Sequence, residues 1–431
     1  MDTVPAAAAW VRRHSAWCYP AFTFVLAFGI RLYWVRHAII APYGDVASLE
    51  TFAHNVATGL YYGGNGVYWP PLFIFLAGFT ERFFGTGHSL LAVRTLIAVI
   101  SSLGVAALTD LGRRLLHSPA AGLVAGILMA FYVPSIYYSN VVLNVTTTVT
   151  MFLLTSDAII AFMDRPGWKR LVVAGVLLGL AALSKPIAMG LVVPAFIAWG
   201  LRSRRGFDLH FAGLSLAGLV IIALLVNVPW TVRNWVVTGS PVFVDMNGGV
   251  NFYLAHNPKA DGYFVNMGNN DPVLAGWDLP STGKRAMHAG EAYFFSHPGA
   301  DLHQALTVTR LFWESPDWDI PVQGKPLLTL LQHYHIPPLQ FLTIRLLALA
   351  GLVCLIPLRR RIVFIVVTVL GYNLGLALFF FAPRFRLPIE PLLLLCVAGG
   401  VVQAVKWIVR DLRETASDPG EASADGAAGL G

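Results

Sequence analysis

The sequence has little charge and little cysteine, and each shortage excludes a class of protein. Charged residues make up 12% of its 431 positions, whereas 56% are hydrophobic. Soluble domains carry about twice that share of charge. The three cysteines, Cys18, Cys354 and Cys396, all lie in apolar segments, which excludes a disulfide framework and a cysteine metal quartet. The composition indicates a membrane protein.

Nucleotide-binding motifs are also lacking. The sequence contains neither a Walker motif nor the glycine motif of dinucleotide-binding folds. Its net charge of +7 does not indicate nucleic acid, because Lys and Arg mark the cytoplasmic loops of membrane proteins. We therefore expect no nucleic-acid partner and expect membrane lipids to surround the chain.

Long apolar segments are what the sequence does have. Several reach about 18 residues with almost no charge, the length of a helix that spans a bilayer. We expect an all-α polytopic membrane protein of about ten transmembrane helices, with a small mixed extracytoplasmic domain. The helices are predicted near residues 16–38, 91–112, 119–138, 140–163, 171–185, 187–201, 213–233, 341–358, 362–381 and 387–408.

The basic residues orient these helices. If residues 69–84 lie on the outer surface or re-enter without crossing, every basic cluster between the helices falls on one side, which the positive-inside rule makes cytoplasmic. Both termini are then cytoplasmic, and the loops 39–90 and 234–340 lie outside a cell (inner or plasma) membrane.

The same pattern divides the chain into four parts. Residues 1–233 form an N-terminal transmembrane catalytic module that includes the outer loop 39–90. Residues 234–340 form an extracytoplasmic domain, and residues 341–413 form the C-terminal transmembrane helices. The tail 414–431 is small, polar and acidic, which is typical of disorder.

A polar helix is predicted directly after the first apolar segment. From Asp45 to Leu60 the apolar residues recur at helical spacing, while Glu50 and His54 lie elsewhere on the helix. Asp45 at its start is either an N-cap or a base, because a carboxylate at the outer interface can accept a proton from a hydroxyl and costs little there.

An ordered set of short motifs resembles one family over nearly the whole chain. The order runs from Gly44-Asp45 through "WPPL", "GRRLL", "YVPSIYYSNVVLN", "GVLLGLAALSKP", "PWTVRNW" and "HNP" to "PRFRLPIEP". It is similar to the GT-C membrane glycosyltransferases, above all to bacterial relatives of the protein O-mannosyltransferases and of the aminoarabinose transferases that modify lipid A. The likeness leaves out the tail and much of 260–335.

The resemblance implies an enzyme with an extracytoplasmic active site. It would transfer a hexose or pentose from a polyprenyl-phosphate-linked sugar to a glycan, lipid or protein acceptor, and Asp45 occupies the place of the family's proposed catalytic base. We expect inverting displacement, with Asp45 as general base.

The leaving lipid phosphate would need positive charge close by. Arg384 and Arg386 lie at the outer end of the last span, as a phosphate clamp or as snorkelling side chains. Lys185 ends the fifth helix before a proline, and such a residue is a functional candidate. Arg233 is either a further phosphate ligand or a C-terminal helix cap.

Six further residues are expected to line the substrate site: Glu50, His54, Tyr62, Trp69, Asn144 and His256. Family members often carry an acidic residue where Asn140 and Asn144 stand, so the resemblance gives no second carboxylate there. No cofactor is certain. A divalent metal ion held by Asp45, His54 and His256 stays open, although their spacing is not a metal signature.

Other functions stay open. A flippase or transporter of lipid-linked glycans predicts charges along the middle of the membrane, whereas here they gather at one face. A polysaccharide polymerase would also keep outer arginines, and a non-enzymatic assembly subunit would tolerate the loss of Asp45. The sequence does not reveal the sugar, the acceptor, the lipid length or the oligomeric state.

The orientation makes a prediction about accessibility. Cysteines introduced at Thr58 and at Gly268 should react with a membrane-impermeant thiol reagent in intact cells, because both positions are predicted to lie outside. If either position reacts only after the cells are lysed, both the orientation and the exclusion of 69–84 from the spans are wrong.

Overall fold

The structure is a computed structural model of the chain. It describes residues 10, 13–38, 44–60, 67–85, 89–203, 206–265, 267, 271–276, 279–314 and 341–417. Two residues named above, Tyr62 and Gly268, lie outside these ranges. Within the described residues the chain is helical and has no β-strand, and Tyr263 and Phe381 form an isolated bridge. The "mixed" character predicted for the outer domain is therefore wrong for its described part.

The helices follow one another through mostly short connections. In chain order they are α2 (Ser15–His37), α3 (Asp45–Thr58), α4 (Pro71–Phe84), α5 (Ser89–Leu115), α6 (Pro119–Ala130), α7 (Val133–Tyr138), α8 (Val145–Asp164), α9 (Trp168–Ser184), η2 (Pro186–Leu191), α10 (Val192–Gly200), α11 (Leu209–Thr238), α12 (Asn247–Ala255), α13 (Leu279–Ser296), α14 (Pro298–Glu314), α16 (Phe341–Cys354), η3 (Ile356–Leu358), α17 (Arg359–Ala377), η4 (Pro383–Phe385) and α18 (Glu390–Ser417).

Six of the described helices are long and apolar enough to cross a membrane. They cover Ser15–His37, Leu90–Leu115, Val145–Asp164, Leu209–Thr238, Ile356–Ala377 and Glu390–Leu412. Three shorter apolar helices cover Pro119–Ala130, Pro186–Gly200 and Phe341–Cys354. The chain is thus a multi-pass helical protein, and the expected number of ten spans stays a prediction.

Two predicted helices are interrupted. The single helix expected over 119–138 ends at Ala130, and α7 starts at Val133 with Pro134 in its first turn. Proline at the first helical positions starts a new helix because it has no N–H to donate to the turn before it. The helix expected over 187–201 begins as the 3₁₀ helix η2, whose first residue is Pro186. At the C-terminus α18 runs past residue 413, the predicted boundary of the tail, to Ser417.

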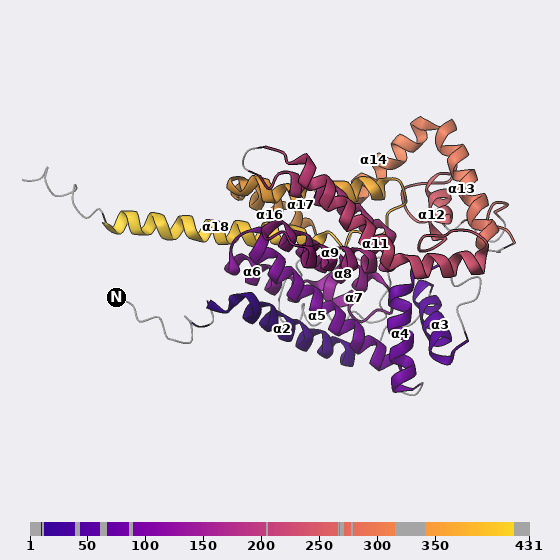
Figure 1. The fold of residues 1–431 in the computed structure, drawn as a ribbon, viewed down its shortest axis with the longest axis horizontal. Helices are drawn as coiled ribbons and strands as arrows, with labels where there is room; N and C mark the ends of the chain where they lie inside the picture. The colour runs from indigo at the N-terminus through magenta and orange to yellow at the C-terminus, as the bar shows by residue number, and fades with distance from the viewer. Residues whose placement is uncertain are drawn as a thin grey trace, which may run out of the picture.

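The helices form a bundle with two distinct ends (Figure 1). The start of α2 and the end of α18 lie at one end, and α3, α4, α12, α13 and α14 lie at the other. Helix α4 has 14 residues, so it is about 21 Å long and shorter than the ~30 Å hydrocarbon core. That residues 69–84 do not cross the membrane stays a prediction.

Close packing holds α4 against α3. A Cβ added at Gly78 would lie 2.6 Å from the Val56 Cβ and 2.7 Å from the Ala53 carbonyl oxygen. Only glycine allows the two helices to approach this closely. The pair α3–α4 therefore forms a compact outer layer that places the start of α3 beside the ends of the long helices.

The predicted cytoplasmic charges meet at one end of the bundle. Arg114 at the end of α5 pairs with Asp110 at 2.7 Å and with Asp157 of α8 at 3.1 Å. Arg361 at the start of α17 pairs with Asp164 at 2.8 Å and donates to the Arg114 carbonyl oxygen. Basic residues far apart in sequence thus gather at one place, as the predicted orientation requires.

Candidate active site

Asp45 lies at the start of α3 and faces a cation from the far end of the sequence. Its Oδ2 accepts a hydrogen bond from the Arg384 Nη2 at 2.7 Å. The N-cap of α3 is Gly44, with a φ of 52°, so the prediction that Asp45 caps the helix is wrong. The carboxylate therefore points at Arg384 and is partly open to solvent, since 39% of the side chain is exposed.

Arg384 shares an aromatic neighbour with Lys185. The Lys185 Nζ lies 3.8 Å from the centre of the Phe385 ring, and the Arg384 guanidinium carbon lies 5.4 Å from it. Lys185 follows the last residue of α9 in extended conformation, as predicted from Pro186. Two cations, one just after α9 and one in η4, thus lie around one ring, and Arg384 is the one that contacts Asp45.

Asn144 lies next to this pair of cations. Its Nδ2 donates to the Ser184 carbonyl oxygen at 3.4 Å, and Ser184 directly precedes Lys185. Thr148 strengthens the contact, because its hydroxyl lies 2.9 Å from the Ser184 hydroxyl. Asn144 and Thr148 therefore hold the end of α9 from which Lys185 extends.

A second carboxylate, Asp245, joins the site although the sequence analysis did not single it out. It lies in the segment between α11 and α12, which α11 fixes by two hydrogen bonds to the Val244 carbonyl oxygen: from Trp230 at 2.7 Å and from Asn234 at 3.2 Å. Burial raises the pKa of Asp245 to about 7, and the positive charge of Lys185 opposes that rise.

Tyr68 connects the two carboxylates electrostatically. Burial raises the pKa of its hydroxyl, and the negative charges of Asp45 and Asp245 raise it further. Its ring meets that of Trp69 edge to face, with 5.2 Å between the centres. Trp69 is partly buried against the main core, so its position is set by packing.

Arg386, two residues after Arg384, has a different environment. It is fully buried, and its Nε donates to the Glu390 Oε1 at 2.7 Å. Its Nη1 donates to the Phe312 carbonyl oxygen at 3.0 Å, and its guanidinium lies 3.5 Å from the centre of the Phe341 ring. Tyr132 completes the network by donating to the other Glu390 oxygen at 2.8 Å. This arginine therefore joins α14, α16 and α18 inside the protein.

Arg233 lies within α11, which continues to Thr238, so the prediction that it caps the end of this helix is wrong. Its guanidinium carbon lies 4.8 Å from the centre of the Trp230 ring, and its Nη1 donates to the Asn234 Oδ1 at 3.2 Å. Trp230 and Asn234 are the residues that hold the segment before Asp245. Arg233 thus contacts the two residues that hold the segment before Asp245 in place.

Glu50 and His54 lie further along α3, in a separate cluster. The His54 Nδ1 lies 2.7 Å from the Glu81 Oε1 of α4. Burial raises the pKa of Glu50, while Arg94 lowers it and Glu81 raises it. Nine residues of helix separate Asp45 from His54, which corresponds to about 13 Å along the axis. His54 thus connects α3 to α4, and Glu50 faces the charges of Arg94 and Glu81.

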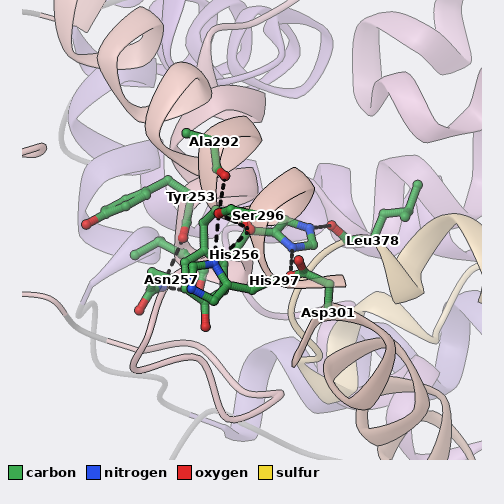
Figure 2. Close-up of polar contacts among 10 residues, drawn as sticks. Tyr253, His256, Asn257, Ala292, Ser296, His297, Asp301 and Leu378 are labelled. Atoms are coloured by element: carbon green, nitrogen blue, oxygen red, sulfur yellow. Dashed lines mark hydrogen bonds and ion pairs between the residues drawn. The ribbon is translucent and has the colours of Figure 1, made fainter. Parts of the chain in front are cut away.

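His256 links α14 to the segment that carries Arg384. Figure 2 shows its ring between Asp301 of α14 and Leu378, just after α17. The Nδ1 lies 2.6 Å from the Asp301 Oδ1, and the Nε2 lies 3.0 Å from the Leu378 carbonyl oxygen. Both ring nitrogens are therefore engaged, and His256 fastens the start of the 378–386 segment to α14.

These positions test the suggested metal ligands. Asp45 contacts Arg384, His54 contacts Glu81, and His256 contacts Asp301 and Leu378. In the part of the chain that the structure describes, no three His, Cys, Asp or Glu side chains come together as a metal site would need. The three suggested ligands thus do not fit a shared metal ion.

A protein family model matches the middle of the chain. Residues 69–230 match the family model of the dolichyl-phosphate-mannose-protein mannosyltransferases. No curated protein matches the chain in sequence.

Solved structures resemble the whole chain in fold. The oligosaccharyltransferase AglB of Archaeoglobus fulgidus, in complex with an inhibitory peptide and a dolichol-phosphate, is 13% identical with a TM-score of 0.57, covering 94% of this chain and 52% of that one. The same archaeal enzyme tethered to an acceptor peptide gives a TM-score of 0.59 at 12% identity, covering 96% and 52%. ArnT from Cupriavidus metallidurans, bound to undecaprenyl phosphate, gives 0.51 at 15% identity, covering 97% and 67%.

The chain has the GT-C fold. The resemblance stated from the sequence is thereby confirmed. At these identities the solved structures establish the fold, and the chain spans about half the length of the archaeal oligosaccharyltransferase. The residues that act in this chain therefore have to be inferred from its own geometry.

The two arginines of the 383–386 segment are predicted to differ in what they contribute. Arg386→Ala should lower the free energy of unfolding by about 3–5 kcal/mol, because Glu390 is left buried without its cation. Arg384→Ala should cost no more than ~1 kcal/mol, as expected for a partly exposed ion pair. Thermal unfolding in detergent measures both. Equal losses in the two variants would contradict the division of roles.

Proposed function

We propose that the chain transfers a sugar from a polyprenyl-phosphate donor to an acceptor on the extracytoplasmic face. The observation that carries the proposal is the contact of Asp45 with Arg384 at 2.7 Å, with Lys185 beside the same aromatic ring. A carboxylate next to two cations provides a base for an acceptor hydroxyl and positive charge for a leaving phosphate. The lipid phosphates bound to the two GT-C neighbours support this donor class.

In the proposed reaction the acceptor oxygen attacks the anomeric carbon from the side opposite the phosphate. The new C–O bond forms as the bond between the anomeric carbon and the phosphate oxygen breaks, so the configuration inverts. Asp45 takes the acceptor proton, a role worth roughly 10²–10⁴ in rate. The electron pair of the broken bond leaves with the lipid phosphate, and Arg384 and Lys185 stabilise its growing charge.

The same contact supports an exchange of partners. Without donor, the Arg384 guanidinium pairs with Asp45 at 2.7 Å, and this contact keeps the carboxylate from the acceptor hydroxyl. A donor phosphate would compete for the guanidinium, which binds phosphate in bidentate geometry. Arg384 would then hold the phosphate while Asp45 is released toward the acceptor. Donor binding would thereby activate the base.

Asp245 is assigned to adjusting the charge of the phosphate site. With its pKa raised to about 7, it changes between neutral and charged near neutral pH, next to Lys185. When it is neutral, more of the positive charge of Lys185 is available to the phosphate. Asp245 therefore acts through Lys185 and does not touch the reacting atoms.

The proposed arrangement in the membrane follows from the two ends of the bundle. In this proposal the end with α3, α4 and α12–α14 faces the outside, and the end with the start of α2 and the end of α18 faces the cytoplasm. Both chain termini are proposed to be cytoplasmic. About ten apolar segments would cross, some of them in short helices. The acceptor is a glycan, a lipid or a protein.

The role of Asp45 is tested by a substitution that keeps its size. Asp45→Asn should fold and insert normally while sugar transfer falls by at least ~10², because the amide cannot take the proton. Turnover is measured with detergent-purified protein and a panel of polyprenyl-phosphate sugars, at matched protein amounts and with thermal stability in parallel. Glu291→Gln, a carboxylate of α13 outside the site, is the control.

Near-normal turnover of Asp45→Asn would remove it as the base and leave Glu50 as the next carboxylate to test. If the protein is active in cells but the purified protein transfers no sugar from any donor in the panel, a flippase or a non-enzymatic assembly subunit is favoured.

A further inference from the structure

A cavity with several polar side chains lies between α14 and the segment before Gly262, and none of the proposed donor-site residues lines it. Its volume is about 590 Å³, within the range typical of small-molecule sites. One wall is a single face of α14, and the opposite wall is the segment just before Gly262. The lining residues are Ala260, Asp261, His303, Gln304, Leu306, Thr307 and Arg310.

One amide that lines this cavity is buried and unpaired within the described part of the chain. Gln304 is 5% exposed, and its Nε2 is buried with no hydrogen-bond partner among the described residues. A buried amide donor without an acceptor costs about 1–3 kcal/mol. Such a group is retained where a bound molecule or water supplies the acceptor. This Gln304 donor is therefore the first indication that the cavity binds a ligand.

The opposite wall is held in place before any ligand arrives. Gly262 has a φ of +94°, and a Cβ there would lie 2.8 Å from the Thr307 Cγ2, so only glycine lets the segment approach α14 this closely. Asp261 fixes the turn by accepting a hydrogen bond from the Tyr263 N–H at 2.9 Å. The Phe381 N–H donates to the Gly262 carbonyl oxygen at 2.8 Å.

The chemistry of the lining selects the class of ligand. Within one cavity lie a carboxylate, a guanidinium, an imidazole, an amide and a hydroxyl, from Asp261, Arg310, His303, Gln304 and Thr307. Sugar hydroxyls donate and accept at once, so they satisfy the Asp261 carboxylate and the donors of Gln304 and Arg310 together. A phosphate would meet the negative charge of Asp261, and an apolar chain would offer no acceptor to the buried Gln304 amide.

We propose that this cavity binds a sugar unit of a glycan acceptor. The identification of this sugar as part of an acceptor rests on the proposed transferase function. The binding itself requires no turnover and can be measured separately. It narrows the acceptor from glycan, lipid or protein to a molecule that presents sugar hydroxyls.

Hydrogen bonds connect both walls of the cavity to the segment that carries Arg384. The Gly262–Phe381 hydrogen bond ties one wall to a residue three positions before Arg384. The other wall, α14, carries Asp301, which holds His256 and through it Leu378. Both walls are thus fastened to the segment that presents Arg384, so a glycan in the cavity is placed at a fixed position relative to Asp45.

The test measures binding directly on the purified full chain. The probes are maltotriose, mannotriose and chitotriose, with trialanine as the peptide alternative, observed by saturation-transfer difference NMR and titration. At least one trisaccharide should bind the unchanged protein. Gln304→Leu and Arg310→Met should each weaken that binding at least ~10-fold, as expected for one or two lost hydrogen bonds. His288→Ala, an exposed residue of α13, should leave it unchanged.

The outcomes separate this proposal from the transferase function. Binding of no trisaccharide, or equal binding in the variants, overturns the cavity assignment, and trialanine binding that the variants lose replaces the glycan with a peptide. Arg310 is 67% exposed, so Arg310→Met keeps the test valid even if Gln304→Leu fails to fold. Asp45→Asn should bind the trisaccharide like the unchanged protein, so a loss of transfer there leaves the cavity result standing.

Discussion

The buried pair of Arg386 and Glu390 is the interaction on which the site depends. Two opposite charges inside a helical bundle are stable only when their hydrogen-bonding groups are satisfied. Here Tyr132, the Phe312 carbonyl oxygen and the Phe341 ring provide that environment. Arg386 lies two residues after Arg384. Holding Arg386 in place therefore also holds the short turn that presents the Arg384 guanidinium. His256 secures the other end of the segment through Leu378. The position of Arg384 is thus set from both sides before a substrate binds.

Neighbouring arginines can therefore serve opposite purposes. Arg386 is enclosed, so its charge holds helices together, whereas Arg384 is partly open and faces a carboxylate that solvent also reaches. An ion pair at such an interface is weak enough to exchange its partner. The proposed mechanism uses this property, because the phosphate that needs Arg384 also frees Asp45. Asp245 and Lys185 extend the same electrostatic unit to the end of α9, and the cavity between α14 and Gly262 adds a place for the acceptor.

The sequence predicted part of this arrangement from general rules. Positive charge at the outer end of the last span pointed to Arg384, and a lysine at a helix end before a proline pointed to Lys185. The polar start of α3, together with the family resemblance, pointed to Asp45. The rest depended on contacts between distant segments. Asp245 has no local signal, since its environment comes from α11 and Lys185. The different roles of Arg384 and Arg386 follow from burial: Glu390 is an i,i+4 neighbour of Arg386, but Tyr132 comes from a distant part of the chain. The break at Pro134 shows local chemistry overriding a continuous apolar run, which hydropathy alone reads as one helix.

Direct binding of undecaprenyl phosphate tests the partner exchange most closely, since this lipid carries the phosphate without a sugar and no turnover interferes. Purified protein, Asp45→Asn, Arg384→Ala and the double variant would be compared at one lipid and detergent composition. The exchange predicts opposite effects: Asp45→Asn binds more tightly than the unchanged protein because Arg384 is released, whereas Arg384→Ala binds at least ~10-fold more weakly, as expected for the loss of a charge-assisted hydrogen bond of about 1.5–3 kcal/mol. The double variant should behave like Arg384→Ala. Unchanged binding by Arg384→Ala, or weaker binding by Asp45→Asn, would contradict the account.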